Sequence, residues 1–120
     1  MRLRNVMIVV NDIERSIRFY KELFGLQVIV NRQGNVVMTE GLVLQDAGVW
    51  KDVIHRELTP KNNMTELYFE EADIELFVKK LETSEFEITY VNELTEHSWG
   101  RQVIRFYDPD GNLIEVGTAV

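Results

Sequence analysis

The most constraining feature of this 120-residue chain is an internal repeat. The run Asp12-Ile13-Glu14 recurs as Asp73-Ile74-Glu75, and Val30-Asn31 recurs as Val91-Asn92. Both recurrences have the same offset of 61 residues (73 − 12 and 91 − 30). A half-chain unit with a small sheet cannot bury its apolar face alone, so repeated units of this kind are expected to pack or to pair. The sequence therefore predicts two copies of one structural unit.

The first unit has the pattern of a βαβββ module. Asp12 is a favourable N-cap residue, apolar residues then recur at helical spacing, and Gly25 occupies the position of a helix-terminating glycine. The predicted elements are a strand at 4–10, a helix at 13–24 and strands at 26–31, 36–39 and 42–47. The first strand is rich in β-branched residues, as strands usually are.

The second unit repeats this order after a predicted linker. Asp73 begins a helix with an apolar face, and strands are expected at 65–70 and 86–92 and on both sides of a final turn. We expect one α+β domain over 1–120, with module 1 at about 1–47, a linker at 48–63 and module 2 at about 64–120. Each module would place one helix on the outside of a curved mixed sheet, and the two sheets would form a cup.

The final turn, Asp108-Pro109-Asp110-Gly111-Asn112, predicts a tight β-hairpin. Proline presets φ for a turn, glycine accepts a positive φ, and Asp and Asn bond the local backbone. Glu115 follows in an otherwise apolar strand. Because strand residues alternate between faces, Glu115 is expected on the face opposite to Ile114 and Val116.

Four polar residues occupy equivalent positions in apolar strands of the two modules. Glu115 aligns with Gln45 at an offset of 70 (115 − 45), and Glu66 aligns with Asn5 at an offset of 61 (66 − 5). With the apolar faces against the helices, these carboxylate and amide groups point to the other side of the sheets. That face is a candidate ligand or metal site.

Composition narrows the classes of partner. The formal net charge of −7 and the pI of about 4.8 argue against nucleic acid or an anionic membrane as a partner. The longest apolar run, 6–10, is too short to span a bilayer, and no cysteine offers a thiolate or a disulfide. We expect a cytoplasmic protein with a small-molecule ligand.

The paired modules, the helix motif at 11–20 and the ending Arg-Phe-Tyr-Asp-Pro-Asp-Gly-Asn-Leu-Ile-Glu at 105–115 resemble the glyoxalase / bleomycin-resistance / extradiol-dioxygenase (vicinal oxygen chelate) superfamily. The resemblance covers essentially the whole chain. It implies a homodimer and a metal bound by the first and last strands of each module. In this chain the implied ligands are Asn5, Gln45, Glu66 and Glu115.

This ligand set departs from the superfamily at Asn5 and Glu66, which stand where histidines are common. The resemblance implies that the metal would act as a Lewis acid on a vicinal-oxygen substrate and that Glu115 or Glu66 would act as the catalytic base. An all-oxygen set suits Mg²⁺ or Mn²⁺ better than Zn²⁺, and Ni²⁺ is a further candidate. The alternative is a pocket without a metal.

Further candidate ligand-binding residues surround this face, and each has a purely structural alternative. His97 and Trp99 could contact a planar ligand, or Trp99 could close the core. Arg105 could bind an anionic group, or it could form a cross-strand ion pair with Glu115. The remaining candidates for the pocket wall are Tyr68, Glu70 and Met7.

Three classes of function remain open from the sequence. The first is a metal-dependent lyase, isomerase or dioxygenase. The second is a metal-free protein that sequesters a ligand, as in antibiotic resistance; an acidic cup without histidines suits a cationic ligand. The third is a non-catalytic sensing module.

Overall fold

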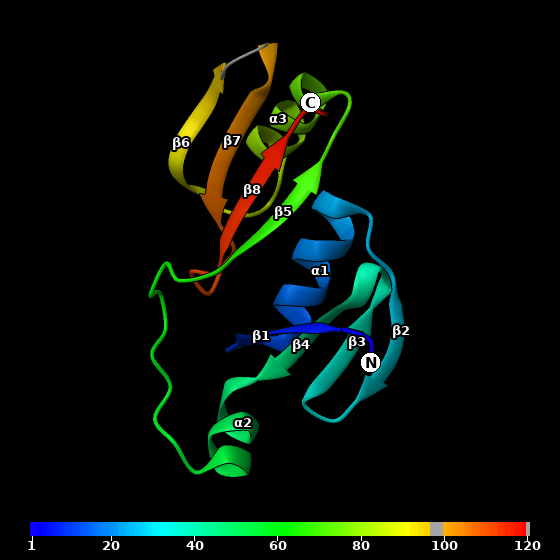
Figure 1. The fold of residues 1–120 in the computed structure, drawn as a ribbon, viewed down its shortest axis with the longest axis vertical. Coiled ribbons are helices and arrows are strands. Elements are labelled where there is room, and N and C mark those ends of the chain that lie inside the picture. The colour runs from blue at the N-terminus through cyan, green and yellow to red at the C-terminus, as the bar shows by residue number, and fades with distance from the viewer. Residues whose placement is uncertain (97–99, 120) are drawn as a thin grey trace. The chain divides into compact units, whose positions relative to one another are not determined.

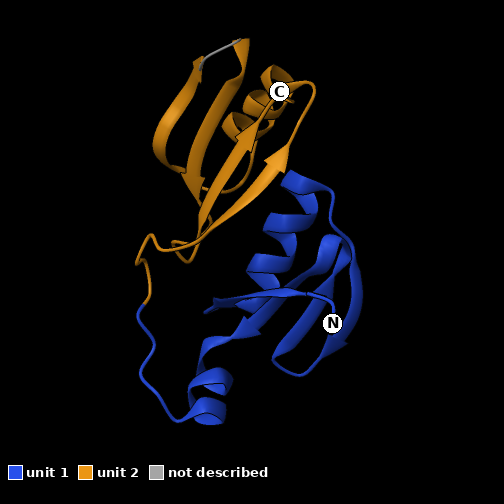
Figure 2. Cartoon of the chain, in the orientation of Figure 1, with its two compact units in different colours: residues 1–59 blue, residues 60–120 orange. Residues whose placement is uncertain are grey.

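The computed structural model describes residues 1–96 and 100–119. The chain divides into two compact units, residues 1–59 and 60–120 (Figure 2). Residues 97–99, which include the predicted ligand contacts His97 and Trp99, lie outside the described residues.

Unit 1 is a four-stranded mixed sheet with two helices (Figure 1). Its strand order is β1-β4-β3-β2, with β1 and β4 parallel and the other pairs antiparallel. The elements are β1 (Val6–Val10), α1 (Ile13–Phe24), β2 (Val28–Arg32), β3 (Asn35–Met38), a 3₁₀ turn (Thr39–Gly41), β4 (Leu42–Asp46) and α2 (Ala47–Ile54).

Unit 2 has the same topology. Its strand order is β5-β8-β7-β6, again with only the first pair parallel among the described strands. The elements are β5 (Glu66–Glu70), α3 (Ile74–Thr83), β6 (Thr89–Glu96), β7 (Gln102–Tyr107) and β8 (Leu113–Gly117). The α+β class and the two βαβββ modules predicted from the sequence are confirmed.

The helix boundaries follow from the capping residues that the sequence contains. The Asp12 carboxylate accepts a hydrogen bond from the backbone N–H of Arg15 at 3.0 Å and begins α1. Gly25, with a left-handed φ of 70°, ends it. Asp73 caps α3 in the same way through the N–H of Leu76 at 3.1 Å. Equivalent caps in the two units confirm the repeat at the local level.

One face of each sheet packs against a helix and forms the core. In unit 1 the helix α1 buries Phe19, Tyr20 and Leu23, whereas three other apolar residues of the helix, Ile13, Ile17 and Phe24, are only half-buried. In unit 2 the rings of Phe77 on α3 and Phe106 on β7 lie 6.1 Å apart. The other buried residues of that face are Ile74, Leu81, Ile104, Ile114 and Val116. The polar residues of the sheets are therefore on the opposite face.

Two elements differ from the sequence expectation. The helix α2 occupies the beginning of the predicted linker, where the Asp46 carboxylate caps it through the N–H of Val49 at 3.0 Å. The strand expected at 86–92 instead spans Thr89–Glu96. Phe86 is held beside the end of α3 because its N–H donates to the Ser84 hydroxyl oxygen at 3.3 Å.

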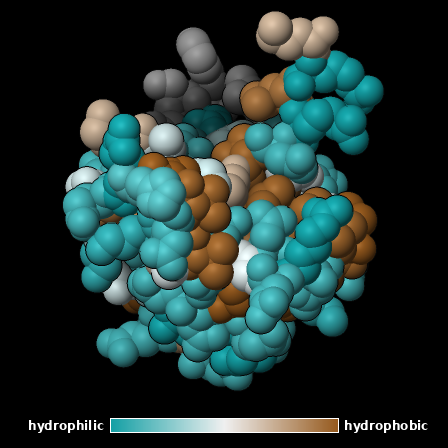
Figure 3. All heavy atoms as spheres, turned by 90° about the horizontal axis from the view of Figure 1, so that it is seen from below, coloured by the Kyte–Doolittle hydropathy of each residue, from teal (hydrophilic) through white to brown (hydrophobic). Residues whose placement is uncertain are grey.

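No helix in the described part of the chain is long and apolar enough to cross a membrane. Apolar residues, some of them adjoining, lie between polar residues on the face drawn in Figure 3. Exposed apolar side chains include Val49 and Val53 of α2 and Ile29 of β2. Singly exposed apolar residues are common on folded proteins and do not by themselves identify an interface.

Candidate functional site

The turn between β7 and β8 determines which residues of the site face one another. Asp108 Oδ1 accepts hydrogen bonds from the backbone N–H groups of Asp110 at 2.9 Å and Asn112 at 2.8 Å. Gly111 adopts a φ of 86°, a conformation that side-chain-bearing residues rarely adopt. A turn fixed in this way determines the register of the hairpin, and it pairs Arg105 with Glu115, one of the alternatives considered from the sequence.

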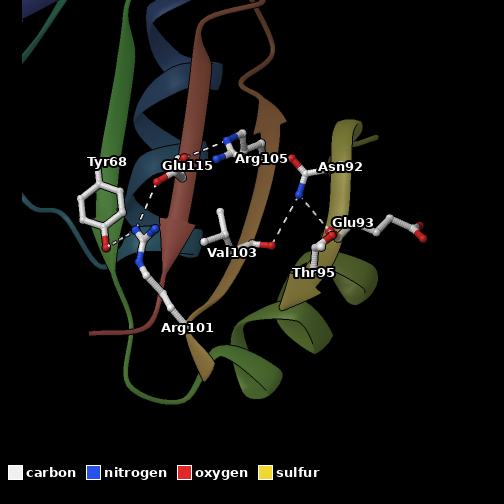
Figure 4. Close-up of polar contacts among 8 residues, drawn as sticks. All are labelled: Tyr68, Asn92, Glu93, Thr95, Arg101, Val103, Arg105 and Glu115. Atoms are coloured by element: carbon white, nitrogen blue, oxygen red, sulfur yellow. Dashed lines mark hydrogen bonds and ion pairs between the residues drawn. The ribbon is translucent and has the colours of Figure 1, made fainter. Parts of the chain in front are cut away.

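The register of the neighbouring strands adds Tyr68 to this row, because Tyr68 on β5 is paired with Glu115 on β8. On the other side of Arg105 lies Asn92 of β6. Paired residues of adjacent strands point to the same face of a sheet. Tyr68, Glu115, Arg105 and Asn92 therefore form one polar row across unit 2, on the face that does not contact α3 (Figure 4).

Two arginines hold the Glu115 carboxylate. Arg105 Nε donates to Glu115 Oε1 at 2.7 Å, and Arg101 Nη2 donates to Glu115 Oε2 at 3.3 Å. The Glu115 side chain is only 10% exposed, so its charge is largely removed from water and needs this pairing. The cross-strand ion pair, one of the two alternatives for Arg105, is present.

The two arginines have different further partners (Figure 4). Arg105 Nη1 donates to Asn92 Oδ1 at 3.0 Å. Arg101 Nη2 donates to the Tyr68 hydroxyl oxygen at 2.8 Å, and the guanidinium carbon of Arg101 lies 5.2 Å from the centre of the Tyr68 ring. The hydrogen bond with Tyr68 raises the pKa of Arg101, partial burial opposes that shift, and the Glu115 carboxylate adds to it. Arg101 is thus a permanent cation at this face.

Unit 1 has a neutral version of the same pair. Gln45 on β4 is in register with Asn35 on β3, and Asn35 Nδ2 donates to Gln45 Oε1 at 2.8 Å. Asn35 and Arg105 are separated by 70 residues (105 − 35), the same offset that separates Gln45 and Glu115. The equivalence of Gln45 and Glu115 inferred from the sequence is thus matched by equivalent pairing.

The first-strand candidates are placed less symmetrically. Gln45 is paired with Val9, which lies four residues after Asn5, whereas Glu115 is paired with Tyr68, which lies two residues after Glu66. At about 3.3 Å per residue, these displacements are about 13 Å in unit 1 and about 7 Å in unit 2. Within its unit, Glu66 is therefore nearer to Glu115 than Asn5 is to Gln45.

The other candidate residues fall on the expected faces. Glu66 and Glu70 alternate with the half-buried residues of β5 and lie on the Tyr68 face, and both are exposed. Met7 lies two residues before Val9 and shares the face of Gln45. Asn5 precedes β1, and its Nδ2 donates to the carbonyl oxygen of Gly41 at 3.3 Å.

These donors fit a divalent metal ion poorly as they are arranged. Both Glu115 oxygens accept from guanidinium groups, whose positive charge repels a cation, and Gln45 Oε1 accepts from Asn35. In residues 1–96 and 100–119, no group of three or more His, Cys, Asp or Glu side chains is arranged to hold a metal. The four-residue ligand set stays a prediction.

A hollow of about 300 Å³ lies at the hairpin end of unit 2. Thr89 and Tyr107 line it, and because these two residues are in register they point to the same face as Arg105. Lys61 lines it too, at a positive φ of 54°. The remaining lining residues are Asp108, Pro109 and Gly111. The polar row and this hollow thus belong to one face.

Sequence reasoning missed Arg101, Asn92 and Asn35 as members of these polar pairs. Asn35 could have been found by extending the 70-residue offset from Glu115 and Gln45 to Arg105. Asn92 could not, because the β6–β7 register shifts on both sides of it. Arg101 precedes β7 and reaches Glu115 by the length of its side chain, which strand alternation does not predict.

Comparison with known proteins identifies a matching family model and several solved structures with a similar fold. A family model described as a glyoxalase-like domain matches residues 3–120. A protein of unknown function from Agrobacterium tumefaciens str. C58 has a similar structure, with a TM-score of 0.86, 29% identity, and coverage of 100% of this chain and 95% of that chain.

Two further solved structures share the fold at lower identity. One is a glyoxalase/bleomycin resistance protein/dioxygenase family enzyme from Burkholderia phytofirmans PsJN, with a TM-score of 0.81, 16% identity and 98% coverage of each chain. The other is the fosfomycin resistance protein FosX from Mesorhizobium loti, with a TM-score of 0.74, 15% identity, and coverage of 99% of this chain and 92% of that chain. At these identities the likeness concerns the fold alone.

Proposed function

The chain belongs to the family of glyoxalase-like domains, and on that premise we propose that it binds a small molecule without a metal ion, on the polar face of unit 2. The binding surface is the row Tyr68, Glu115, Arg105 and Asn92 with Arg101 beside it. Of the functions considered for the sequence, this is the metal-free ligand-binding class.

One observation carries the proposal: both oxygens of Glu115 are already engaged by arginines. A metal ion at Glu115 would have to displace at least one guanidinium group and then remain next to the other. Two unit charges 4 Å apart interact by about 4 kcal/mol in a partly screened protein environment, and the repulsion is larger for a divalent ion. The residues favour hydrogen bonding to a ligand over metal coordination.

The hollow beside Tyr107 supports a ligand on this face. Its volume of about 300 Å³ is at the lower end of the usual range for small-molecule sites, roughly 300–1,000 Å³. Tyr107 lies two residues beyond Arg105 on β7, a displacement of about 7 Å. A ligand of ordinary metabolite size could fill the hollow and reach the polar row.

A second candidate is a metal-dependent lyase, isomerase or dioxygenase, and the position of Glu66 favours it. Glu66 is exposed and lies on the Glu115 face, and within the described residues its side chain has no hydrogen bond or ion pair. A carboxylate of this kind is available as a metal ligand or as a base. In this candidate Glu66 and Glu115 would hold Mg²⁺, Mn²⁺, Ni²⁺ or Zn²⁺ together with Asn5 and Gln45.

Calorimetry distinguishes the two candidates. Chelator-treated protein is titrated with each of the four metal ions, in parallel with Glu66→Gln and with Glu75→Gln, a control on the exposed first turn of α3. For the metal-free function we expect no saturable binding that depends on Glu66. Binding near one ion per site that Glu66→Gln abolishes and Glu75→Gln preserves would overturn the proposal.

The ligand is sought separately. A thermal-shift screen of metabolites and antibiotics, both cationic and anionic, is run on the chelator-treated protein. A ligand of the metal-free protein raises Tm, and a tighter ligand at the same concentration raises it more. The homodimer implied by the family is tested in the same samples by light scattering. A chain mass of 14.1 kDa would become twice that value in a dimer.

A further inference from the structure

The two arginines at Glu115 are not equivalent, and the difference concerns their unused hydrogen-bond donors. Arg105 uses two different nitrogens, one for Glu115 at 2.7 Å and one for Asn92 at 3.0 Å. Arg101 uses a single nitrogen, Nη2, for both Tyr68 and Glu115, and its contact with Glu115 is the longer one at 3.3 Å. Arg101 therefore leaves most of its guanidinium donors unused at this carboxylate.

Arg101 Nε carries an unsatisfied donor. This atom is buried and has no hydrogen-bond partner among the described residues. Buried polar groups in folded proteins are nearly always paired, and an unpaired donor costs free energy. Nε and Nη2 form the edge of the guanidinium group that binds carboxylate and phosphate with two parallel hydrogen bonds. The present position of Arg101 satisfies only half of that edge.

Tyr68 offers a second donor at the same place. Its hydroxyl oxygen accepts from Arg101, and within the described part of the chain its O–H has no acceptor. The residue is 46% exposed, so a ligand can reach the ring and the hydroxyl group. A ligand that accepts from the Tyr68 O–H would lie within reach of the Arg101 guanidinium group.

The charge of the cluster points to an anion. Two guanidinium groups surround one carboxylate, which leaves an excess of one positive charge in a chain with a net charge of −7. Glu66 and Glu70 lie on the same face, but the described structure pairs neither with Arg101. Release of Arg101 from Glu115 would still leave that carboxylate paired with Arg105 at 2.7 Å.

We propose that Arg101 and Tyr68 together bind the carboxylate or phosphate-type group of an anionic ligand, with Arg101 exchanging Glu115 for the ligand while Arg105 keeps Glu115 in place. The apolar part of the ligand packs on the exposed Tyr68 ring. This inference rests on the proposed metal-free binding function and replaces the cationic ligand expected from the sequence, because the arginines more than neutralise Glu115.

The test uses three probes on the full chain: benzoate, phenylphosphonate and inorganic phosphate. We expect benzoate or phenylphosphonate to bind in calorimetry, and the better of the two identifies the class of anion. Arg101→Ala should weaken binding by about tenfold or more, because a charge-assisted pair of hydrogen bonds is lost. Tyr68→Phe should weaken it by about threefold to tenfold, because the ring stays and one donor is lost.

Arg32→Ala provides the matched control, since Arg32 is an exposed arginine at the end of β2 in unit 1. Its affinity for the probe should equal that of the unmodified chain. The Nε–H resonance of Arg101, assigned by its loss in Arg101→Lys, should shift on addition of the probe while that of Arg105 stays nearly unchanged. This measurement does not depend on the stability of any variant.

Three results would overturn the inference. They are the absence of binding by every probe at millimolar concentration, equal binding by Arg101→Ala, and a probe that moves the Arg105 resonance more than the Arg101 resonance. None of these results depends on the metal titration, so the metal-free function and the anion-binding role of Arg101 are tested by different measurements. A cationic ligand from the thermal-shift screen would retain that function and exclude the anion.

Discussion

Units 1 and 2 have the same strand order and place a polar cross-strand pair at the same position, yet only one pair is charged. In unit 1 an amide meets an amide, Asn35 with Gln45 at 2.8 Å, and in unit 2 a guanidinium meets a carboxylate, Arg105 with Glu115 at 2.7 Å. The position of the pair is therefore common to both units of the fold, whereas its charge is found in unit 2.

The strands on the other side of these pairs, β1 in unit 1 and β5 in unit 2, also differ in polarity. Gln45 is paired on its other side with the apolar Val9, whereas Glu115 is paired with Tyr68, whose hydroxyl oxygen accepts from Arg101. In unit 1 the polar pair thus ends at an aliphatic residue, which offers no further hydrogen bond. Unit 2 extends its pair into a network with unused donors, and we infer that the ligand-binding role resides there.

The largest effect should come from removing the charge in unit 2. Glu115→Gln leaves Arg105 and Arg101 without an anion in a carboxylate site that is only 10% exposed. We expect a loss of about 2–3 kcal/mol in the free energy of unfolding, below the usual range for a broken buried pair because both arginines are partly exposed. Urea unfolding measures it, and a loss under about 0.5 kcal/mol would place this pair with exposed surface ion pairs.

The reverse exchange in unit 1 should cost less and should be repairable. Gln45→Glu places a buried carboxylate opposite the Asn35 amide, and we expect a loss of about 1–2 kcal/mol. Adding Asn35→Arg should restore about 1 kcal/mol of it, because it recreates the pair of unit 2 at the same register. A double-mutant cycle measured by urea unfolding gives this coupling energy, and a coupling of zero would show that the position does not accept a charged pair.

The two units also differ two residues after Gln45 and Glu115. Gly117 in unit 2 is equivalent to Ala47 in unit 1 at the offset of 70 (117 − 47). A Cβ atom at Gly117 would lie 2.8 Å from Arg101 Nη2 and 3.2 Å from the Tyr68 hydroxyl oxygen. Gly117→Ala should therefore displace Arg101 from Tyr68 at a cost of about 0.5–1 kcal/mol, because the end of a flexible side chain moves and the backbone does not.

The measurements for Gly117→Ala are Tm and the chemical shift of the Arg101 Nε–H resonance. Gly48→Ala in α2 is the control, since its new Cβ would meet only Asp46 Oδ2 at 3.3 Å. Alanine is favoured over glycine in a helix, so Tm of that variant should not fall. An unchanged Arg101 resonance in Gly117→Ala would show that Gly117 does not determine the position of Arg101.

The sequence predicted most of the fold because local signals agreed with the repeat. Asp12, Asp73 and Gly25 determine helix ends by hydrogen bonds that involve only nearby residues. The hairpin turn determines its own register, and the pairing of Arg105 with Glu115, one of the alternatives that the sequence left open, is the one observed. The helix α2 escaped prediction because it has only eight residues and contains Gly48, a residue that disfavours a helix interior.

The candidate site was predicted only in part, because it depends on pairings between distant strands. Matching letters put Asn5 and Glu66 at equivalent positions, but the strand register places Val9 and Tyr68 beside Gln45 and Glu115. A letter repeat compares positions along the chain, whereas contacts depend on hydrogen-bond register across the sheet. Arg101 precedes β7 and contacts Glu115 from outside the strand, so the alternation of strand residues does not predict this contact.

The smallest effect should come from Tyr90, on the face of unit 2 that carries the core. Its ring lies 6.4 Å from that of Phe106, and burial, then the carboxylates of Glu82 and Glu93, raise the pKa of Tyr90 above its ordinary value of 10.0. A raised pKa means that folding favours the neutral phenol. This contribution is fully present below about pH 10 and is lost as the pH rises through the folded pKa.

Tyr90→Phe should therefore match the unmodified chain in Tm up to about pH 9 and should lose less Tm between pH 9 and pH 11, because phenylalanine has no proton to lose. Tyr68→Phe, at the exposed row, is the control for the loss of a hydroxyl group, since Tyr68 is 46% exposed and lies on the other face of the sheet. Equal alkaline losses in Tyr90→Phe and the unmodified chain would show that folding does not raise the pKa of Tyr90. We therefore expect the two faces of unit 2 to respond to different variables, the core face to alkaline pH through Tyr90 and the polar row to anions through Arg101.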